Sequence, residues 1–243
     1  MTILQAIILG IVQGITEFLP ISSTAHLIFA GRLLGLYANA DTVLRAEQTT
    51  ATIAVMQIGT LVAILIYFAQ DILNIAVSFI RDHMELVGRF VGSKQAVNDG
   101  RRFKLSSDAR LGWLVIIGTL PVAIVGLVFK HQIEGTFTKN LWVIAIMMIL
   151  IALALAMAER IGRQRTVIED LQVSDALAVG SAQVLALIPG ASRSGSTIMG
   201  GLFAGQTRET AARFSFLLSI PAITASGLLE LKEAIIKLPD GSA

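Results

Sequence analysis

Three long apolar runs constrain this chain more than any other feature of its sequence. They cover about residues 52–68, 111–129 and 141–158, and each is long enough to cross a hydrocarbon core of about 30 Å as a helix. Only 15% of the 243 residues are charged and the mean hydropathy is +0.74. Because soluble domains carry about 25% charged residues, the sequence predicts an all-α, polytopic membrane protein.

Two further stretches are apolar but carry polar residues. Residues 211–231 contain Arg213 near the start and Pro221 in the middle, so we expect a fourth, kinked span. Residues 72–91 are apolar first and charged later, which predicts a helix that leaves the membrane and lies at its interface.

The charges indicate orientation and exclude some functions. Lys and Arg concentrate in residues 81–110 and 159–175 and are sparse in 130–139, so the first two segments are expected in the cytoplasm and the third outside. A net charge of +2 gives no reason to expect a nucleic-acid partner. The absence of cysteine excludes disulfides, thiolate metal ligands and cysteine nucleophiles.

Residues 6–36 and 176–206 differ from plain spans because proline, glycine and hydroxyl residues interrupt them. They also resemble each other, with one residue dropped before the prolines; the pairs are Gly10 with Gly180, Gln13 with Gln183, and Pro20 with Pro189. Three spans lie between them, and an odd number of crossings inverts the second copy. The sequence therefore predicts two re-entrant helix–loop–helix hairpins, inserted from opposite sides, whose tips meet near the midplane.

This repeat implies one integral membrane domain over residues 1–243. Repeat one covers about 1–160 as a hairpin followed by three spans. Repeat two covers about 174–243 as a hairpin followed by one span, so two closing helices are missing from it. We expect either a truncated second copy or a partner chain, such as a second copy in a homodimer, that covers the exposed flank.

The first interrupted segment carries a cluster of polar residues. Gln13 and Glu17 are four residues apart and so share one helix face. Beyond the helix-breaking proline come the remaining polar residues of the cluster, Ser22, Ser23, Thr24 and His26. A carboxylate, hydroxyls and an imidazole this close together can hold a divalent cation and supply a nucleophile or a base.

Arg193 is the single charge between residues 176 and 207. A lone arginine at mid-bilayer costs about 2.5–3.5 kcal/mol, so an anion is expected to meet it. Its hydroxyl neighbours are Ser192, Ser194, Ser196 and Thr197. A guanidinium fork among such donors suits phosphate oxygens. The alternatives are that Glu17 and Arg193 form a purely structural pair and that the hydroxyls only bond their own helix or pack between helices.

Two motifs carry a resemblance to a known family. "QGITEFLPISSTAH" from Gln13 to His26 and "PGASRSGST" from Pro189 to Thr197 resemble the signatures of the bacterial undecaprenyl-pyrophosphate phosphatases, the bacitracin-resistance family. The resemblance implies a multi-pass hydrolase of the bacterial cytoplasmic (inner) membrane. Such an enzyme converts undecaprenyl pyrophosphate, a polyprenyl lipid, to the monophosphate carrier of cell-wall synthesis. It also implies dependence on Mg²⁺ or another divalent cation such as Ca²⁺.

Roles for individual residues follow from the same resemblance. It implies that Glu17 and Gln13 lie near the metal or the pyrophosphate, although many members have Glu at the position of Gln13. It also implies that Ser23 and His26 are catalytic and that Ser192, Arg193, Ser194 and Thr197 form the phosphate-binding loop. With the chemistry of the neighbouring side chains, we expect catalytic roles for Ser23, His26, Glu17 and Arg193. We expect substrate contacts from Ser22, Thr24, Ser192, Ser194, Ser196 and Thr197. The nucleophile is either Ser23 activated by His26 or His26 itself.

The rival interpretation is an inverted-repeat transporter or flippase for an anionic lipid or solute. Such a protein needs Arg193 but has little use for a serine and a histidine beside Glu17. The other large class of membrane lipid phosphatases requires a histidine downstream of the arginine, and none follows Arg193.

Overall fold

The computed structural model describes residues 1–36, 42–91, 104–129 and 140–237, and only the backbone of 42–54, 90–91 and 228–237. These residues are mainly helical and form no β-sheet. The helices are α1 (Ile3–Thr16), α2 (Ser23–Leu33), α3 (Thr42–Tyr67), α4 (Ala69–Val91), α5 (Ser107–Val128), α7 (Leu141–Ile161), α8 (Val173–Gln183), α9 (Arg193–Phe203) and α10 (Arg208–Lys237). Short 3₁₀ turns, η3 (Ile168–Asp170) and η4 (Val184–Leu187), flank α8.

Several of these helices match the predicted spans. Within the described residues, α5 and α7 are long and apolar enough to cross a membrane. A third span is present if the bent pair of α3 and α4, which turn by 70° at Phe68, counts as one. Helix α10 covers the fourth apolar run and continues through Pro221. Its described residues do not form a helix long and apolar enough to count as a membrane span.

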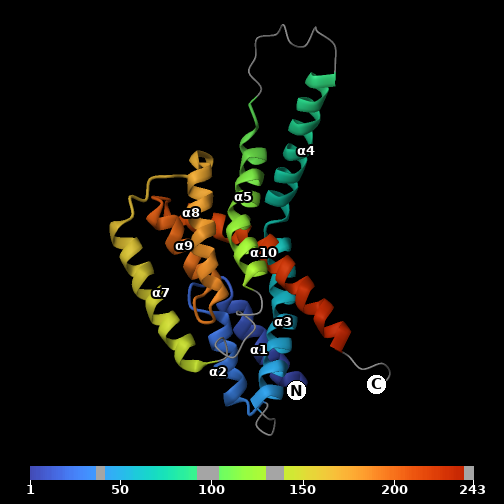
Figure 1. Cartoon of the computed structure of the whole chain (residues 1–243), viewed down its shortest axis with the longest axis vertical. Helices are drawn as coiled ribbons and strands as arrows, with labels where there is room; N and C mark the ends of the chain where they lie inside the picture. The colour runs from blue at the N-terminus through green and yellow to red at the C-terminus, as the bar shows by residue number, and fades with distance from the viewer. Residues whose placement is uncertain (37–41, 92–103, 130–139, 238–243) are drawn as a thin grey trace.

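Two helical hairpins have matching backbone geometry: α1 with α2, and α8 with α9 (Figure 1). Both first helices begin with a capping box, and both second helices are 11 residues long. Each second helix follows a serine with positive φ and ends before a glycine with positive φ; the pairs are Ser22 (67°) with Ser192 (49°), and Gly35 (66°) with Gly205 (88°).

The two serines and the two glycines are separated by the same number of residues along the chain. This constant spacing corrects part of the predicted alignment of the two segments. At that interval Pro20 corresponds to Gly190, so the pairing of Pro20 with Pro189 by dropping one residue is wrong. The reason is that the repeated feature is the positive-φ serine that starts the second helix, not the proline before it.

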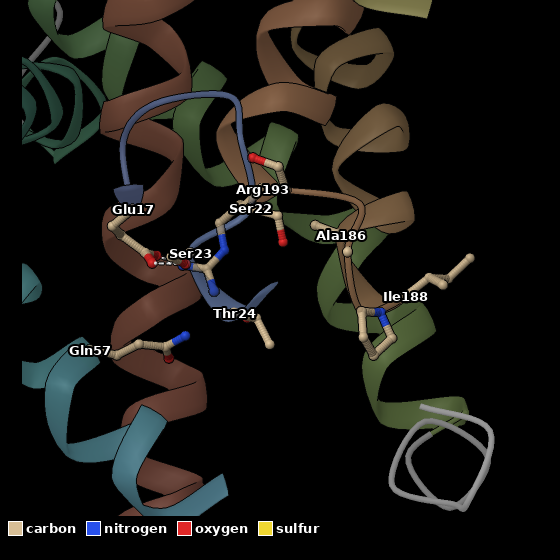
Figure 2. A pocket seen from close by; sticks show the side chains of 11 residues that line it. Glu17, Ser22, Ser23, Thr24, Gln57, Ala186, Ile188 and Arg193 are labelled. Atoms are coloured by element: carbon tan, nitrogen blue, oxygen red, sulfur yellow. Dashed lines mark hydrogen bonds and ion pairs between the residues drawn. The ribbon is translucent and has the colours of Figure 1, made fainter. Parts of the chain in front are cut away.

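The loops of the two hairpins touch beside one pocket (Figure 2). The Ser194 hydroxyl, in the first turn of α9, donates to the Leu19 carbonyl in the α1–α2 loop at 2.8 Å. The same hydroxyl lies 3.4 Å from the Glu17 carbonyl. This contact brings two loops that are far apart in the sequence together around one site.

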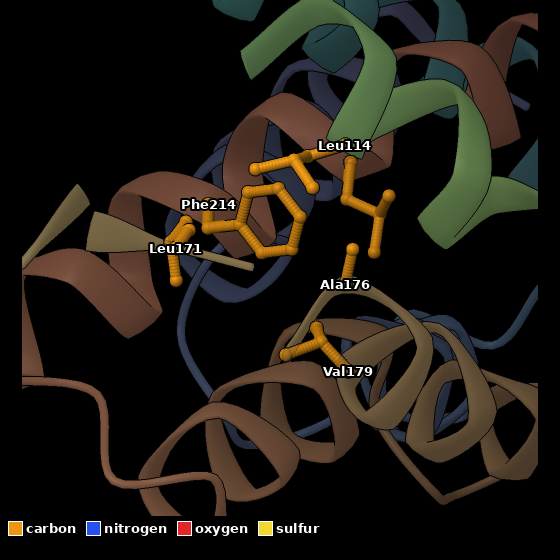
Figure 3. Packing of buried hydrophobic residues seen from close by; sticks show 6 residues of the cluster. Leu114, Leu171, Ala176, Val179 and Phe214 are labelled. Atoms are coloured by element: carbon orange, nitrogen blue, oxygen red, sulfur yellow. The ribbon is translucent and has the colours of Figure 1, made fainter. Parts of the chain in front are cut away.

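Close backbone packing holds the second hairpin in place. A side chain at Gly180 of α8 would overlap the Gly118 carbonyl of α5, so only glycine permits this approach. Beside this contact, Val179, Leu114 and Phe214 bring α8, α5 and α10 together in a buried apolar cluster (Figure 3). Because lipid is as apolar as these side chains, close van der Waals packing stabilises the contact, and this makes the region a rigid support for the loop after α8.

Candidate active site

A small cavity of about 60 Å³ lies where the two hairpin loops meet α3. This volume suits a few water molecules or one small polar group. The polar side chains that line it are Glu17, Ser22, Ser23, Thr24, Gln57, Ser192 and Arg193, and the remaining lining residues are Ala186, Ile188, Pro189 and Gly190. The arrangement therefore gathers candidate residues from both interrupted segments into one place.

Glu17 is the anionic centre of this cavity. It is 8% exposed and sits at the C-terminal cap of α1, one helical turn after Gln13. Its Oε2 atom accepts hydrogen bonds from Gln13 Nε2 at 2.8 Å and from Ser23 Oγ at 2.6 Å. Two donors thus fix the carboxylate, and one of them is the hydroxyl predicted to be a nucleophile.

Arg193 is the cationic counterpart, at the first position of α9. Its Nη1 atom lies 3.7 Å from Glu17 Oε1, which is an ion-pair distance too long for a direct hydrogen bond. Nη1 is buried and has no hydrogen-bond partner within the described residues. This nitrogen can therefore donate to an anion in the cavity, which Arg193 faces (Figure 2). The partial positive charge at the N-terminus of α9 favours an anion at the same place.

His26 is not joined to Ser23 by a hydrogen bond, although one of the two predicted mechanisms has His26 activate Ser23. Its Nδ1 lies 2.8 Å from the Ser22 carbonyl oxygen. A carbonyl can only accept, so Nδ1 carries the proton and Nε2 is the basic nitrogen of the neutral ring. His26 does not line the cavity. The contact instead supports the positive-φ turn at Ser22.

Three other hydroxyl residues predicted to bind substrate, Ser194, Ser196 and Thr197, bond to protein groups and do not line the cavity. Ser194 bonds to the other hairpin loop, as described above. Ser196 donates to the Ala191 carbonyl at 2.9 Å, and Thr197 donates to the Arg193 carbonyl at 2.8 Å. All three hydroxyl residues are buried. In this loop, Ser192 and Arg193 are the polar side chains that reach the cavity.

The oxygen atoms around Glu17 suit a hard divalent cation, but only with help from the substrate. The described residues hold no group of three or more His, Cys, Asp or Glu side chains able to bind a metal. Glu17 is the single carboxylate at the cavity. Gln13 does not line the cavity, but its Nε2 donates to Glu17, and its buried Oε1 has no hydrogen-bond partner among the described atoms. Mg²⁺ is commonly held by one or two carboxylates together with substrate phosphates and water, so this donor set fits that mode.

Gln57 and Thr60 of α3 were missed by the sequence reasoning. Gln57 lines the cavity. Thr60 Oγ1 donates to the Gln57 carbonyl at 2.9 Å and lies 3.5 Å from Gln13 Nε2. The sequence did contain a signal for these two residues. They place a carboxamide and a hydroxyl inside the apolar run 52–68, where polar side chains are costly in lipid unless they have a structural or functional role.

The fold and the site together define a class of protein. The protein combines apolar helices of membrane-spanning length with a small cavity in which a carboxylate, a hydroxyl bonded to it and a guanidinium at ion-pair distance converge. These are the features of a membrane protein with a site for nucleophilic chemistry on an anionic group.

Comparison with known proteins identifies the family. The chain belongs to the bacitracin resistance protein BacA family, whose model matches residues 6–241. It is 51% identical over 236 residues to the undecaprenyl-diphosphatase of Syntrophobacter fumaroxidans, covering 97% of this chain and 78% of the relative. It is 45% identical over 238 residues to the undecaprenyl-diphosphatase of Chlorobaculum tepidum, covering 95% of this chain and 76% of the relative.

Proposed function

We propose that this chain is a membrane phosphatase that hydrolyses undecaprenyl diphosphate to undecaprenyl phosphate and inorganic phosphate. The activity would recycle the lipid carrier of bacterial cell-wall synthesis. Family membership and the names of the relatives support this assignment. The observation that carries it is the 2.6 Å hydrogen bond from Ser23 to Glu17 beside Arg193. A flippase has no evident use for a hydroxyl bonded to a carboxylate at its binding site.

We further propose a multi-pass placement in the inner membrane with the two hairpins inserted from opposite sides. The matched backbone of the hairpins supports an internal repeat. In Figure 1 the first hairpin lies toward the end of the molecule that holds the N-terminus, and the second toward the end where α4 ends and α5 begins. The homodimer stays a prediction.

Ser23 is the nucleophile in the mechanism that this geometry favours. Its Oγ attacks the terminal phosphorus while Glu17 Oε2 accepts the hydroxyl proton. The bond between the terminal phosphorus and the bridging oxygen breaks, and undecaprenyl phosphate leaves with the electron pair. Water then cleaves the phosphoserine and releases inorganic phosphate. His26 holds the Ser22 carbonyl, so it acts on the turn before the nucleophile.

Charge neutralisation supplies the rest of the catalysis. Phosphoryl transfer depends mainly on positioning and on stabilising charge on the phosphoryl oxygens. Arg193 does this with its free donors, and the Ser22 and Thr24 hydroxyls lie in the same cavity. A Mg²⁺ ion bound by Glu17, by the Gln13 amide oxygen and by the diphosphate would neutralise further charge.

Phosphate release from a polyprenyl diphosphate in detergent tests this proposal. We expect release by the wild-type protein, and at least about 100-fold less by Ser23→Ala and Glu17→Gln, because each removes one half of the nucleophile–base pair. Acid quenching with substrate labelled in the terminal phosphate should trap label on the wild type but not on Ser23→Ala. Undetectable release by a folded wild-type protein that moves the lipid between vesicle leaflets would overturn the proposal in favour of a flippase.

A further inference from the structure

The cavity contains more polar side chains than the reaction described above employs. Ser23 is bonded to Glu17, and the Ser192 hydroxyl accepts from the Gly195 amide as the cap of α9. Four polar lining side chains are not committed to hydrogen bonds within the described residues: Ser22, Thr24, Arg193 Nη1 and Gln57. Gln57 differs from the other three because neither hairpin supplies it.

The position of Gln57 is tied to the catalytic carboxylate. Its backbone carbonyl accepts a hydrogen bond from Thr60 Oγ1. Thr60 Oγ1 in turn lies 3.5 Å from Gln13 Nε2, which donates to Glu17. Helix α3 is therefore held in register with the end of α1. In Figure 2 the Gln57 carboxamide extends from α3 into the space below Glu17 and Arg193.

The charges in the cavity explain why a neutral donor is useful at this position. Glu17 and Arg193 together carry no net charge, whereas a diphosphate group brings at least two negative charges. A second cation at Gln57 would compete with Arg193 for Glu17, and a second carboxylate would repel the substrate. A carboxamide donates an N–H to a phosphate oxygen without disturbing the ion pair.

We infer that Gln57 binds the diphosphate group of the substrate, as a third point of contact beside Arg193 and the hydroxyls of the first hairpin. This inference rests on the proposed phosphatase function and deepens it. Gln57 takes no part in proton transfer, because Ser23 donates directly to Glu17. Its loss therefore weakens substrate binding and leaves the chemical step largely intact.

Steady-state phosphate release by full-chain variants at Gln57 tests this inference. We expect Gln57→Ala to raise the KM for a polyprenyl diphosphate about 10-fold with kcat within about 3-fold of wild type, as for a lost hydrogen bond to a charged group. Gln57→Glu has nearly the same shape but repels the phosphate, so its KM should rise more than that of Gln57→Ala. Inhibition by methylenediphosphonate, which has no lipid tail, should weaken in parallel.

The controls separate this inference from the proposed function and from damage to the fold. Gln70→Glu changes a carboxamide that bonds Asn74 on α4 and does not line the cavity, so its kinetics should match wild type. A wild-type protein that releases no phosphate contradicts the proposed function itself. An active wild type together with Gln57→Glu whose KM and inhibition stay within 2-fold overturns the role of Gln57 alone. A loss of kcat without a change in KM would also overturn the role of Gln57 in substrate binding. If Gln57→Ala is not monodisperse, KM and kcat are measured on Gln57→Asn instead.

Discussion

The Ser194 hydroxyl donates a hydrogen bond to the Leu19 carbonyl, and this contact joins the two hairpins at the cavity. The acceptor belongs to the loop that carries Glu17, and the donor follows Arg193 directly in the sequence. The bond therefore sets the spacing between the anionic and cationic sides of the site. Ser194 was predicted to bind substrate, and its place in the structure favours a role in holding the loops together.

Replacing Ser194 with alanine should loosen this junction. The substitution leaves part of the acceptor capacity of the Leu19 carbonyl unused, and such a loss costs about 1 kcal/mol. We expect a lower thermal unfolding midpoint in detergent and a fall in kcat of about 3- to 10-fold, because Arg193 is then less well placed. Ser181→Ala changes an exposed serine on α8 and should alter neither quantity. An unchanged kcat for Ser194→Ala would show that the bond does not position the site.

Replacing Arg193 with alanine should lower kcat/KM at least about 100-fold, because it removes the guanidinium that faces the phosphate. Arg193→Lys keeps the charge but loses the fork of donors, and we expect a loss of about 10-fold. Phosphate release over a range of substrate concentrations measures both. Arg208→Ala is the matched control, since it breaks an arginine–glutamate pair with Glu159 at an exposed site. If the rate of Arg193→Ala stayed within a few-fold of wild type, the proposal that Arg193 binds the substrate phosphate would be contradicted.

The substitution Gln13→Glu tests the metal proposal. It places a second carboxylate beside Glu17, and the two like charges repel unless a cation lies between them. We expect the Mg²⁺ concentration for half-maximal activity to fall about 10-fold, because ligand charge raises the affinity for hard cations. EDTA should abolish phosphate release by both proteins, and Gln70→Glu should leave the Mg²⁺ dependence unchanged. Full activity of the wild type in EDTA would mean that no cation is needed.

The substitution Gly180→Ala tests the close approach of α8 to α5. The added methyl group would collide with the Gly118 carbonyl, and overpacking of this kind costs about 1–3 kcal/mol. We expect a clearly lower unfolding midpoint and a weakened site, since α8 leads into the loop that carries Arg193. Gly14→Ala is the control, because nothing lies within 4 Å of its added methyl group and alanine favours a helix. Equal midpoints for the two variants would contradict this packing.

The residues that form the candidate site follow largely from local rules in the sequence. Gln13 and Glu17 share a face because they are one helical turn apart, and the pair is hydrogen-bonded in the structure. Arg193 could be singled out because a cation in an uncharged stretch needs an anion. The local signal for Gln57 was only a carboxamide inside an apolar run, and the packing of α3 against α1 and α10 is what brings it to the cavity.

The sequence by itself determined the helical membrane class and most of the residues at the site, since hydrophobic run length and helix periodicity are properties of neighbouring residues. Tertiary structure alone decided which groups meet. It gave Ser23 a bond to Glu17 instead of His26, and it turned Ser194 toward the other hairpin. These contacts depend on how closely α8 approaches α5 and how the two loops pack against each other. Such distances between segments far apart in the chain are set by side-chain volume and backbone packing, which no local pattern specifies.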